Sequence, residues 1–77
     1  MEKLLRLLKE INPDIDYESE RHLVGDGLFD SLEIMTIVVS IGEHFHIEIN
    51  AEDVTAENFD SVENMMNLIK KYQEKGE

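Results

Sequence analysis

Residues 30–45 read DSLEIMTIVVSIGEHF, and this stretch decides the fold. Asp30 is a favourable N-cap, and Glu33 follows three residues later in a variant of the capping box. The stretch therefore predicts a helix over about residues 31–45, despite Gly42. At 100° per residue, one apolar arc about 100° wide forms a natural core face. It holds Ile34, Ile37, Val38, Ile41 and Phe45.

A second apolar arc lies outside this core face. It holds Leu32, Met35 and Val39, while Glu33, Ser40 and His44 take the remaining polar side. A helix in a small bundle needs one apolar arc to pack, so the second arc needs another explanation. We interpret it as a surface that other proteins contact.

The chain before this helix predicts one more helix and a long loop. Apolar side chains at Met1, Leu4, Leu5, Leu8 and Ile11 follow helical spacing and predict a helix at about residues 2–11. Asn12-Pro13-Asp14 then signals a turn. Residues 12–30 show no sustained period and read as a functional loop, which we expect Leu23, Val24, Leu28 and Phe29 to fix to the core.

The chain after the central helix predicts two further helices. Residues 47–50 alternate in polarity, but they have no partner strand elsewhere and are interpreted as extended loop. A short helix is expected at about 56–59. Ser61 is placed to cap a last helix at about 61–73, with a stripe of Val62, Met65, Met66, Ile69 and Tyr72. The fold class is therefore all-α, a small antiparallel four-helix bundle of three main helices and one short one, in a single domain spanning residues 1–77.

Composition excludes several function classes. The chain has 77 residues and no cysteine, so thiolate metal sites and a catalytic cysteine are excluded. Its net charge of −11 disfavours nucleic acid as a partner. No apolar run approaches the roughly 20 residues of a membrane span.

We expect a cytoplasmic monomer that does not insert into membranes, free-standing because it begins at Met1 and ends cleanly. A membrane-surface role for residues 2–11 is a minor alternative.

The charges are unevenly distributed along the chain. No Lys or Arg occurs between Arg21 and Lys70, whereas ten acidic residues do. The middle of the protein is thus expected to form a negative surface. Such a surface serves solubility, and it also steers toward partners with basic docking surfaces.

Ser31 stands out for its position rather than for its residue type. It is a hydroxyl at the first position of a helix, directly after a long loop and a capping acid. Backbone N–H groups and the helix dipole favour a phosphate at such a place. These features suit a serine that bears a phosphate-linked group and is presented to other proteins.

With these residues in place, the chain resembles the acyl carrier protein family, including peptidyl and aminoacyl carriers. The resemblance rests on Gly27-Leu28-Phe29-Asp30-Ser31-Leu32, the apolar helix that follows, Phe45-His46-Ile47-Glu48-Ile49, and Glu57-Asn58-Phe59-Asp60-Ser61-Val62. It covers about residues 4–72. Length, acidity and helix order agree with it.

The resemblance implies a carrier without catalysis of its own. Ser31 would bear 4′-phosphopantetheine, added from coenzyme A by a phosphopantetheinyl transferase. The arm would hold acyl or aminoacyl groups as thioesters for partner enzymes, and it would supply the sulfur that the chain lacks. Asp30, Leu32 and Glu33 match the family motif, and Met35 and Val39 take partner-facing positions.

The pathway stays open at this point. Fatty-acid carriers typically have acids where Thr36 and Gly42 stand, so fatty-acid, polyketide, nonribosomal-peptide and D-alanyl-type biosynthesis all remain. The alternative to a carrier is an unmodified helical interaction module that uses Leu32, Met35 and Val39. A hydrolase built from Ser31, His22 and Asp26 lacks an evident orienting group. A metal site at His44 and His46 would need Glu43 or Glu48 as further ligands, and we expect none.

Overall fold

Helix α2, Ser31–Phe45, starts at the cap that its sequence predicts. The computed structural model describes residues 2–75, and in it Asp30 Oδ1 accepts the N–H of Glu33 at 2.8 Å. The second half of the capping box is not formed. The Glu33 carboxylate turns away from the cap and accepts a 3.1 Å hydrogen bond from the side-chain amide of Asn12. Glu33 therefore accepts from the Asn12 side chain instead of from the backbone N–H of Asp30, which a complete capping box would use.

The C-terminal end of α2 is a left-handed cap. His46 has φ 57° and ψ 47°, and its N–H donates to the Gly42 carbonyl. The N–H of Ile47 donates to the same carbonyl at 3.2 Å. A Cβ on Gly42 would lie 3.0 Å from the Ile47 carbonyl oxygen, so glycine lets the chain turn back closely over the helix.

Helix α1, Glu2–Ile11, packs beside α2. Its buried side chains are Leu4, Leu7 and Leu8, while Leu5 and Ile11 are half-buried. Leu7 was missing from the predicted stripe, because the spacing alone does not fix how far the helix rotates about its axis. Met1, which the stripe included, lies outside the described residues. The Lys3 ammonium joins the two helices, since it donates to the His44 carbonyl at 2.7 Å and lies 5.0 Å from the centre of the Phe45 ring.

The connection after α2 contains two short helices. Residues 47–50 form no regular element, Asn50 is extended, and no strand occurs among residues 2–75. A 3₁₀ helix, η1, follows at Ala51–Asp53, and α3 covers Ala56–Phe59 with Thr55 as its cap. Helix α4 runs over Val62–Lys75, and the buried Ser61 hydroxyl caps it by accepting the N–H of Asn64 at 3.1 Å.

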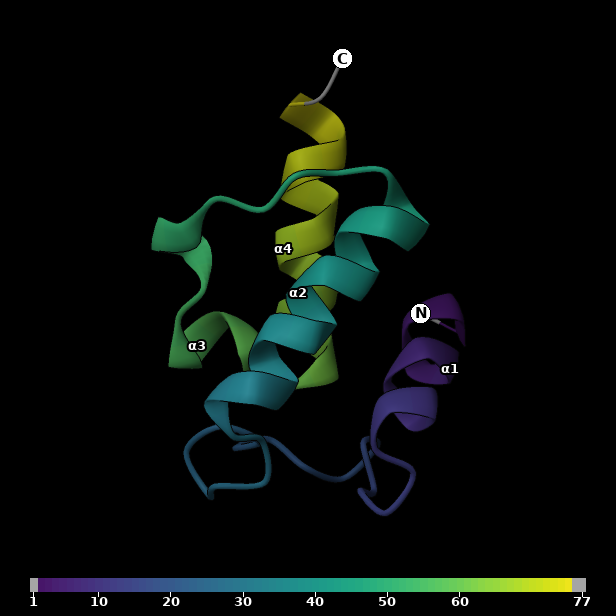
Figure 1. The fold of residues 1–77 in the computed structure, drawn as a ribbon, viewed down its shortest axis with the longest axis vertical. Helices are drawn as coiled ribbons and strands as arrows, with labels where there is room; N and C mark the ends of the chain where they lie inside the picture. The colour runs from purple at the N-terminus through teal and green to yellow at the C-terminus, as the bar shows by residue number, and fades with distance from the viewer. Residues whose placement is uncertain (1, 76–77) are drawn as a thin grey trace.

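The chain direction explains the length of this connection. In Figure 1, α1 runs away from the end marked C, α2 returns toward it, and the segment with η1 and α3 brings the chain back before α4 rises again. Helix α1 is therefore antiparallel to both α2 and α4, whereas α2 and α4 run the same general way. The predicted all-helical four-helix bundle is confirmed, and α1 supplies its antiparallel neighbour.

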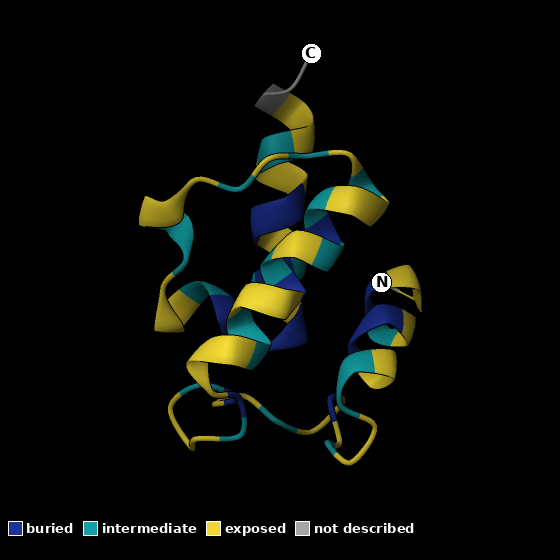
Figure 2. Cartoon of the chain, in the orientation of Figure 1, coloured by how far each residue is buried: buried dark blue, intermediate teal, exposed yellow. Residues whose placement is uncertain are grey.

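The core lies where α1, α2 and α4 face one another (Figure 2). Its fully buried side chains include Leu8, Ile37, Ile41, Met65 and Ile69. The core face predicted for α2 is correct, with Ile34, Val38 and Phe45 half-buried at its margins. The long loop also contributes: Tyr17, Leu23 and Phe29 are buried, and Val24 and Leu28 pack partly against them.

Candidate functional site

Ser31 is the first residue of α2, and its side chain is exposed. None of residues 2–75 hydrogen-bonds to its hydroxyl. The preceding residue, Asp30, is extended, with φ −93° and ψ 179°, and also exposed. The N–H groups of Ser31 and Leu32 belong to the first turn and have no intrahelical acceptor. The hydroxyl is thus free to react, and it stands where unpaired donors and the helix dipole favour an anion.

The loop that leads to Ser31 is held in place by a residue that lies far away in the sequence. Leu23 N–H donates to the Asp60 carbonyl at 2.7 Å, and the N–H groups of Val24 and Gly25 donate to Asp60 Oδ1 at 2.8 and 2.9 Å. Gly27 takes a left-handed φ of 77° where the loop turns toward α2. Asp60 lies at the α3–α4 junction, so this junction sets the path of the loop.

The second apolar arc of α2 is an exposed strip. Leu32 is 76%, Met35 54% and Val39 56% exposed, and these are the exposed large apolar side chains of the described residues. They belong to the exposed residues of α2, which Figure 2 colours yellow. Ser31 directly precedes this strip. A protein that docks on the strip would therefore have the Ser31 hydroxyl at the edge of its contact.

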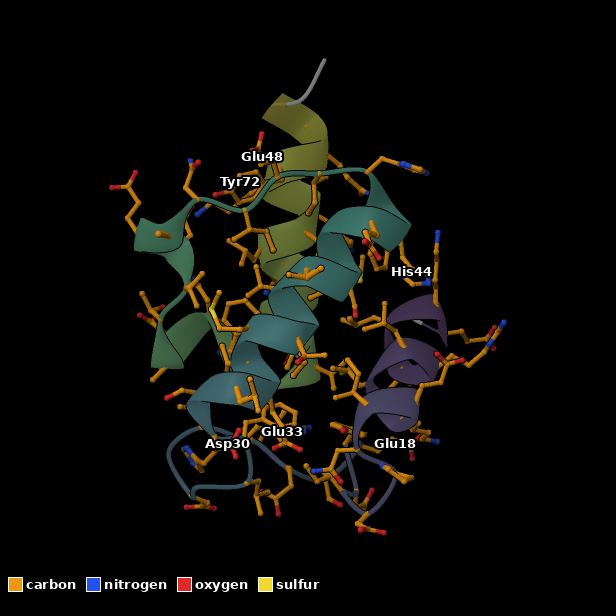
Figure 3. The ribbon with its side chains drawn as sticks, in the orientation of Figure 1. Glu18, Asp30, Glu33, His44, Glu48 and Tyr72 are labelled. Carbon is orange, nitrogen blue, oxygen red and sulfur yellow. The ribbon has the colours of Figure 1, made fainter. Side chains whose placement is uncertain are left out.

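Glu33 is placed differently from the strip. It is half-buried and faces α1, where it accepts from Asn12, as Figure 3 shows near the base of α2. Burial raises the pKa of the neighbouring Tyr17 hydroxyl to about 12, and the Glu33 carboxylate adds to the shift. Glu33 therefore takes part in contacts within the molecule, whereas Asp30, Leu32, Met35 and Val39 face outward.

The acidic charge lies largely uncompensated around this face. Asp26, Asp30, Glu43, Glu48, Glu52 and Glu57 are all exposed. Within the described part of the chain there is a single ion pair, between Arg6 and Glu2 at 4.0 Å on the surface of α1. The field around α2 is therefore negative and attracts basic surfaces.

Several residues considered for a hydrolase or a metal site make other contacts in the structure. Asp26 meets His22 through its backbone N–H, which donates to the His22 carbonyl at 2.8 Å. His44 Nδ1 lies 2.9 Å from the Ser40 carbonyl oxygen. Across residues 2–75, no three His or acidic side chains come together to hold a metal ion. Nor does any helix in that range have both the length and the apolar character needed to cross a membrane.

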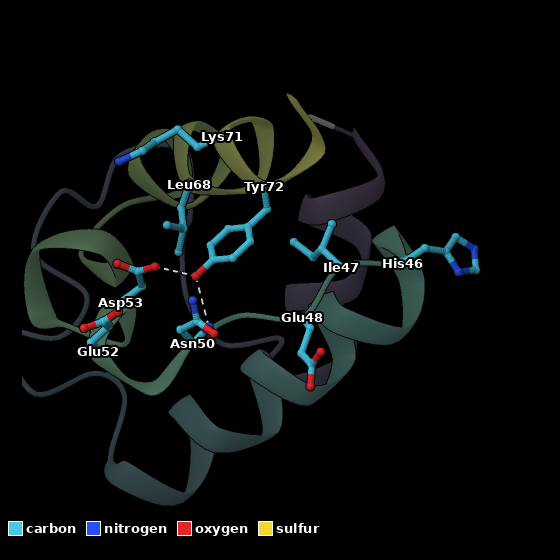
Figure 4. A pocket seen from close by; sticks show the side chains of 9 residues that line it. All are labelled: His46, Ile47, Glu48, Asn50, Glu52, Asp53, Leu68, Lys71 and Tyr72. Carbon is cyan, nitrogen blue, oxygen red and sulfur yellow. Dashed lines mark hydrogen bonds between the residues drawn. The ribbon is translucent and has the colours of Figure 1, made fainter. Parts of the chain in front are cut away.

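A surface pocket lies at the opposite end of the molecule from Ser31. It has a volume of about 490 Å³ between α4 and residues 46–53, with Ile47, Leu68 and Tyr72 among its walls (Figure 4). The Tyr72 hydroxyl donates to the Asp53 carboxylate and accepts the N–H of Asn50 at 3.0 Å. Figure 3 places Tyr72 far from Asp30. Burial, and then the bond to Asp53, raise the pKa of Tyr72.

Sequence reasoning missed three residues that build the site. Asp60 anchors the loop, and Asn12 binds Glu33. The Tyr17 hydroxyl lies 3.0 and 2.7 Å from the carbonyl oxygens of Leu8 and Asn12 and can donate its one proton to either. Asp60 stands in the phrase that resembles the family's third-to-fourth helix junction, so its position was visible but its partner was not. Tyr17 lies in a loop without a periodic pattern, so the sequence contains only a weak indication that its side chain is buried.

Comparison with known proteins gives the family. Residues 2–69 match the family described as "Phosphopantetheine attachment site". The chain is also 43% identical over 54 residues to a protein named "Acyl carrier protein" from Buchnera aphidicola subsp. Baizongia pistaciae (strain Bp), covering 70% of this chain and 67% of that protein. No solved structure gives a significant match.

The site fits the prosthetic group of that family. Its arm is joined through a phosphate ester, which needs an accessible hydroxyl and tolerates a helix N-terminus. Ser31 offers both, and no described side chain bonds to it. The group also brings a thiol to a chain without cysteine. The protein is therefore a carrier of covalent 4′-phosphopantetheine rather than an enzyme, and it belongs to the acyl carrier protein family.

Proposed function

We propose that Ser31 is the attachment site and that the arm carries acyl or aminoacyl groups as thioesters between biosynthetic enzymes in the cytoplasm. The observation that carries the proposal is the exposed, unbonded Ser31 hydroxyl at the start of α2, beside the strip of Leu32, Met35 and Val39. On loading, a bond forms between Ser31 Oγ and phosphorus as the pyrophosphate of coenzyme A breaks. The hydroxyl proton leaves, and adenosine 3′,5′-bisphosphate departs.

The chain's own contribution is presentation. Asp30 fixes the first turn of α2, so the Ser31 hydroxyl projects from a defined place. A tethered cargo reaches each enzyme at a high effective concentration. The negative field speeds encounters with basic docking surfaces without making the complexes tight, which suits a carrier that must leave each partner. The strip then supplies a small apolar contact.

The outward face of α2 favours a specialised carrier as much as a fatty-acid carrier. Glu33 points inward and Glu43 stands in the last turn, so the face between them is apolar or neutral, with Thr36 exposed beside the strip. We propose that partners bind this face through apolar contacts and are attracted by the acidic residues of the neighbouring segments. Adenylating enzymes encoded nearby would indicate amino-acid cargo, and ketosynthases would indicate acyl chains.

Attachment is tested by intact-mass spectrometry after incubation with coenzyme A and a broad-specificity phosphopantetheinyl transferase. We expect a mass increase of one phosphopantetheine group in the wild type and none in Ser31→Ala. Ser40→Ala, a serine change later in the same helix, should still be loaded. An unmodified wild type would instead support the interaction module. Loading of Ser31→Ala would show that another residue is the attachment site.

The strip is tested by the rate of the same loading reaction. Replacing both Leu32 and Met35 by Ala should lower kcat/KM by about tenfold, since two exposed apolar contacts are lost at the centre of an interface. Thermal stability should hardly change, because both side chains are already exposed. Thr36→Ala, on the same face, serves as the control. A wild-type rate in the double variant would contradict docking on the strip.

A further inference from the structure

Asp60 makes an unusual set of contacts for a residue between two helices. Its carbonyl oxygen and Oδ1 accept the N–H groups of Leu23, Val24 and Gly25, three successive donors, at 2.7 to 2.9 Å. The N–H groups of Val24 and Gly25 converge on one carboxylate oxygen, and hydrogen bonds to a charged acceptor are stronger than neutral ones. Two of the three bonds depend on the side chain, so they can be removed by substitution.

These contacts continue to Ser31 through the backbone. Leu23 is fully buried, and its carbonyl accepts the N–H groups of Leu28 and Phe29 at 3.0 and 3.2 Å. Phe29 is buried too and directly precedes the Asp30 cap. Asp60 thus holds Leu23, Leu23 holds Phe29, and Phe29 leads into the first turn of α2.

The remaining hydrogen bonds of this loop are local. Asp26 N–H donates to the His22 carbonyl and Gly27 N–H to the Val24 carbonyl. They shape the loop internally and do not fix it to the bundle. Of the hydrogen bonds that residues 22–29 make within the described chain, those to Asp60 are the ones that reach another part of the fold.

We propose that Asp60 is a positioning residue for Ser31, holding residues 23–29 in the conformation that the transferase binds. The inference rests on the proposed attachment at Ser31. Without the carboxylate the loop samples other conformations, and only a fraction of molecules presents Ser31 correctly. The apparent affinity falls by that fraction, whereas a bound molecule reacts at the usual rate.

The experiment measures loading kinetics at varied carrier concentration, well below the unfolding temperature of each variant. For Asp60→Ala we expect KM to rise about tenfold, with kcat changed less than about twofold. This result corresponds to about one tenth of the molecules holding the loop in the conformation that the transferase binds. Asp60→Asn keeps an acceptor oxygen at the same place and should restore a KM within about threefold of wild type. Glu63→Ala removes an exposed acid in the first turn of α4 and should leave KM unchanged.

The split between KM and kcat separates positioning from a structural role alone. A purely structural Asp60 predicts a lower unfolding temperature and a wild-type KM for molecules that are still folded. An unchanged KM in folded Asp60→Ala therefore overturns the inference, whatever happens to kcat. Failure of the proposed attachment looks different, because loading would then be absent from the wild type or would survive in Ser31→Ala.

A second pair of variants applies if Asp60→Ala does not fold. Gly25→Pro removes one of the two donors to Oδ1 and leaves Asp60 itself in place. Gly25→Ala is the matched control, since its Cβ would meet its nearest neighbours at 3.7 to 3.9 Å, which is ordinary contact. KM should rise in the proline variant only. A wild-type KM in Gly25→Pro overturns the inference.

Discussion

Tyr17 shows how one side chain joins the long loop to two helices. Its ring is 2% exposed and lies 6.2 Å from that of Phe29, centre to centre. Its hydroxyl contacts the carbonyls of Leu8 and Asn12 at the end of α1, where the Leu8 carbonyl also accepts the N–H of Asn12 at 2.8 Å. The loop therefore closes the end of α1 with a side chain and keeps Asn12 in reach of Glu33.

Because the Tyr17 hydroxyl is protonated in the folded state, the free energy of unfolding should decrease at alkaline pH. Burial, with the Glu33 carboxylate, raises its pKa from 10.0 to about 12. In the unfolded chain the phenol ionises first, near its ordinary pKa, so the folded state binds the proton more tightly. The stabilisation is complete below pH 10 and is lost as pH rises from 10 to 12.

We therefore expect the urea midpoint of the wild type to fall over this range more steeply than that of Tyr17→Phe. Tyrosinate absorbance provides the parallel readout, and the ionisation that Tyr17→Phe removes should be the one centred near pH 12. Tyr72→Phe is the control, because Tyr72 is the other tyrosine and also titrates late. Equal slopes in wild type and Tyr17→Phe would contradict a buried, neutral Tyr17.

At the scale of the element, the two ends of α2 are stopped by different means. Asp30 closes the start with its side chain, and His46 closes the end with a left-handed backbone. Glycine is the residue that adopts this conformation without cost, so a histidine there is slightly strained. Two nearby histidines thus sit in opposite backbone environments, His44 inside the last helical turn and His46 just beyond it.

These environments predict opposite effects of the same substitution. His46→Gly should raise the free energy of unfolding by about 0.5–1 kcal/mol, because glycine relieves the left-handed strain. His44→Gly should lower it by about 0.3–0.5 kcal/mol, because glycine is less favourable than histidine within a helix. Urea unfolding at neutral pH measures both changes. Destabilisation by His46→Gly would show that the ring makes a contact worth more than the strain.

The elements themselves were largely predictable, whereas their contacts were not. Asp30 and the period of Ile37 and Ile41 are local signals, so the start and the core face of α2 follow from the sequence. The exposure of Leu32, Met35 and Val39 follows from the same geometry. The partners of the Asp60 side chain lie 35 and 36 residues away, and no periodic pattern encodes them. The hydrogen bond from the Asn12 amide to Glu33 was not predictable either, because these residues are 21 positions apart and belong to no common pattern.

At the scale of the whole molecule, like charges lie close together. The net charge is −11 on a body whose longest dimension is 35 Å, with one ion pair described. At about 10 mM salt the screening length is roughly 30 Å, so charges interact across the molecule, whereas near 150 mM it is roughly 8 Å. Self-repulsion therefore opposes folding most strongly at low salt.

We expect sodium chloride to raise the urea midpoint between these two concentrations. A variant with both Glu43→Gln and Glu48→Gln removes two exposed acids at the end of α2 and beyond it. It should be more stable than the wild type at low salt, and the difference should shrink as salt is added. A wild type that loses stability in salt would indicate that attractive ion pairs dominate.

The link from Leu23, Val24 and Gly25 to Asp60 has a consequence for synthesis on the ribosome. A nascent chain that stops short of residue 60 contains the serine and all of α2, yet it lacks the acceptor that fixes the loop before them. Met65 and Ile69, fully buried in the finished protein, are made later still. A growing polypeptide thus contains Ser31 and its sequence motif long before the loop in front of them can reach its folded conformation.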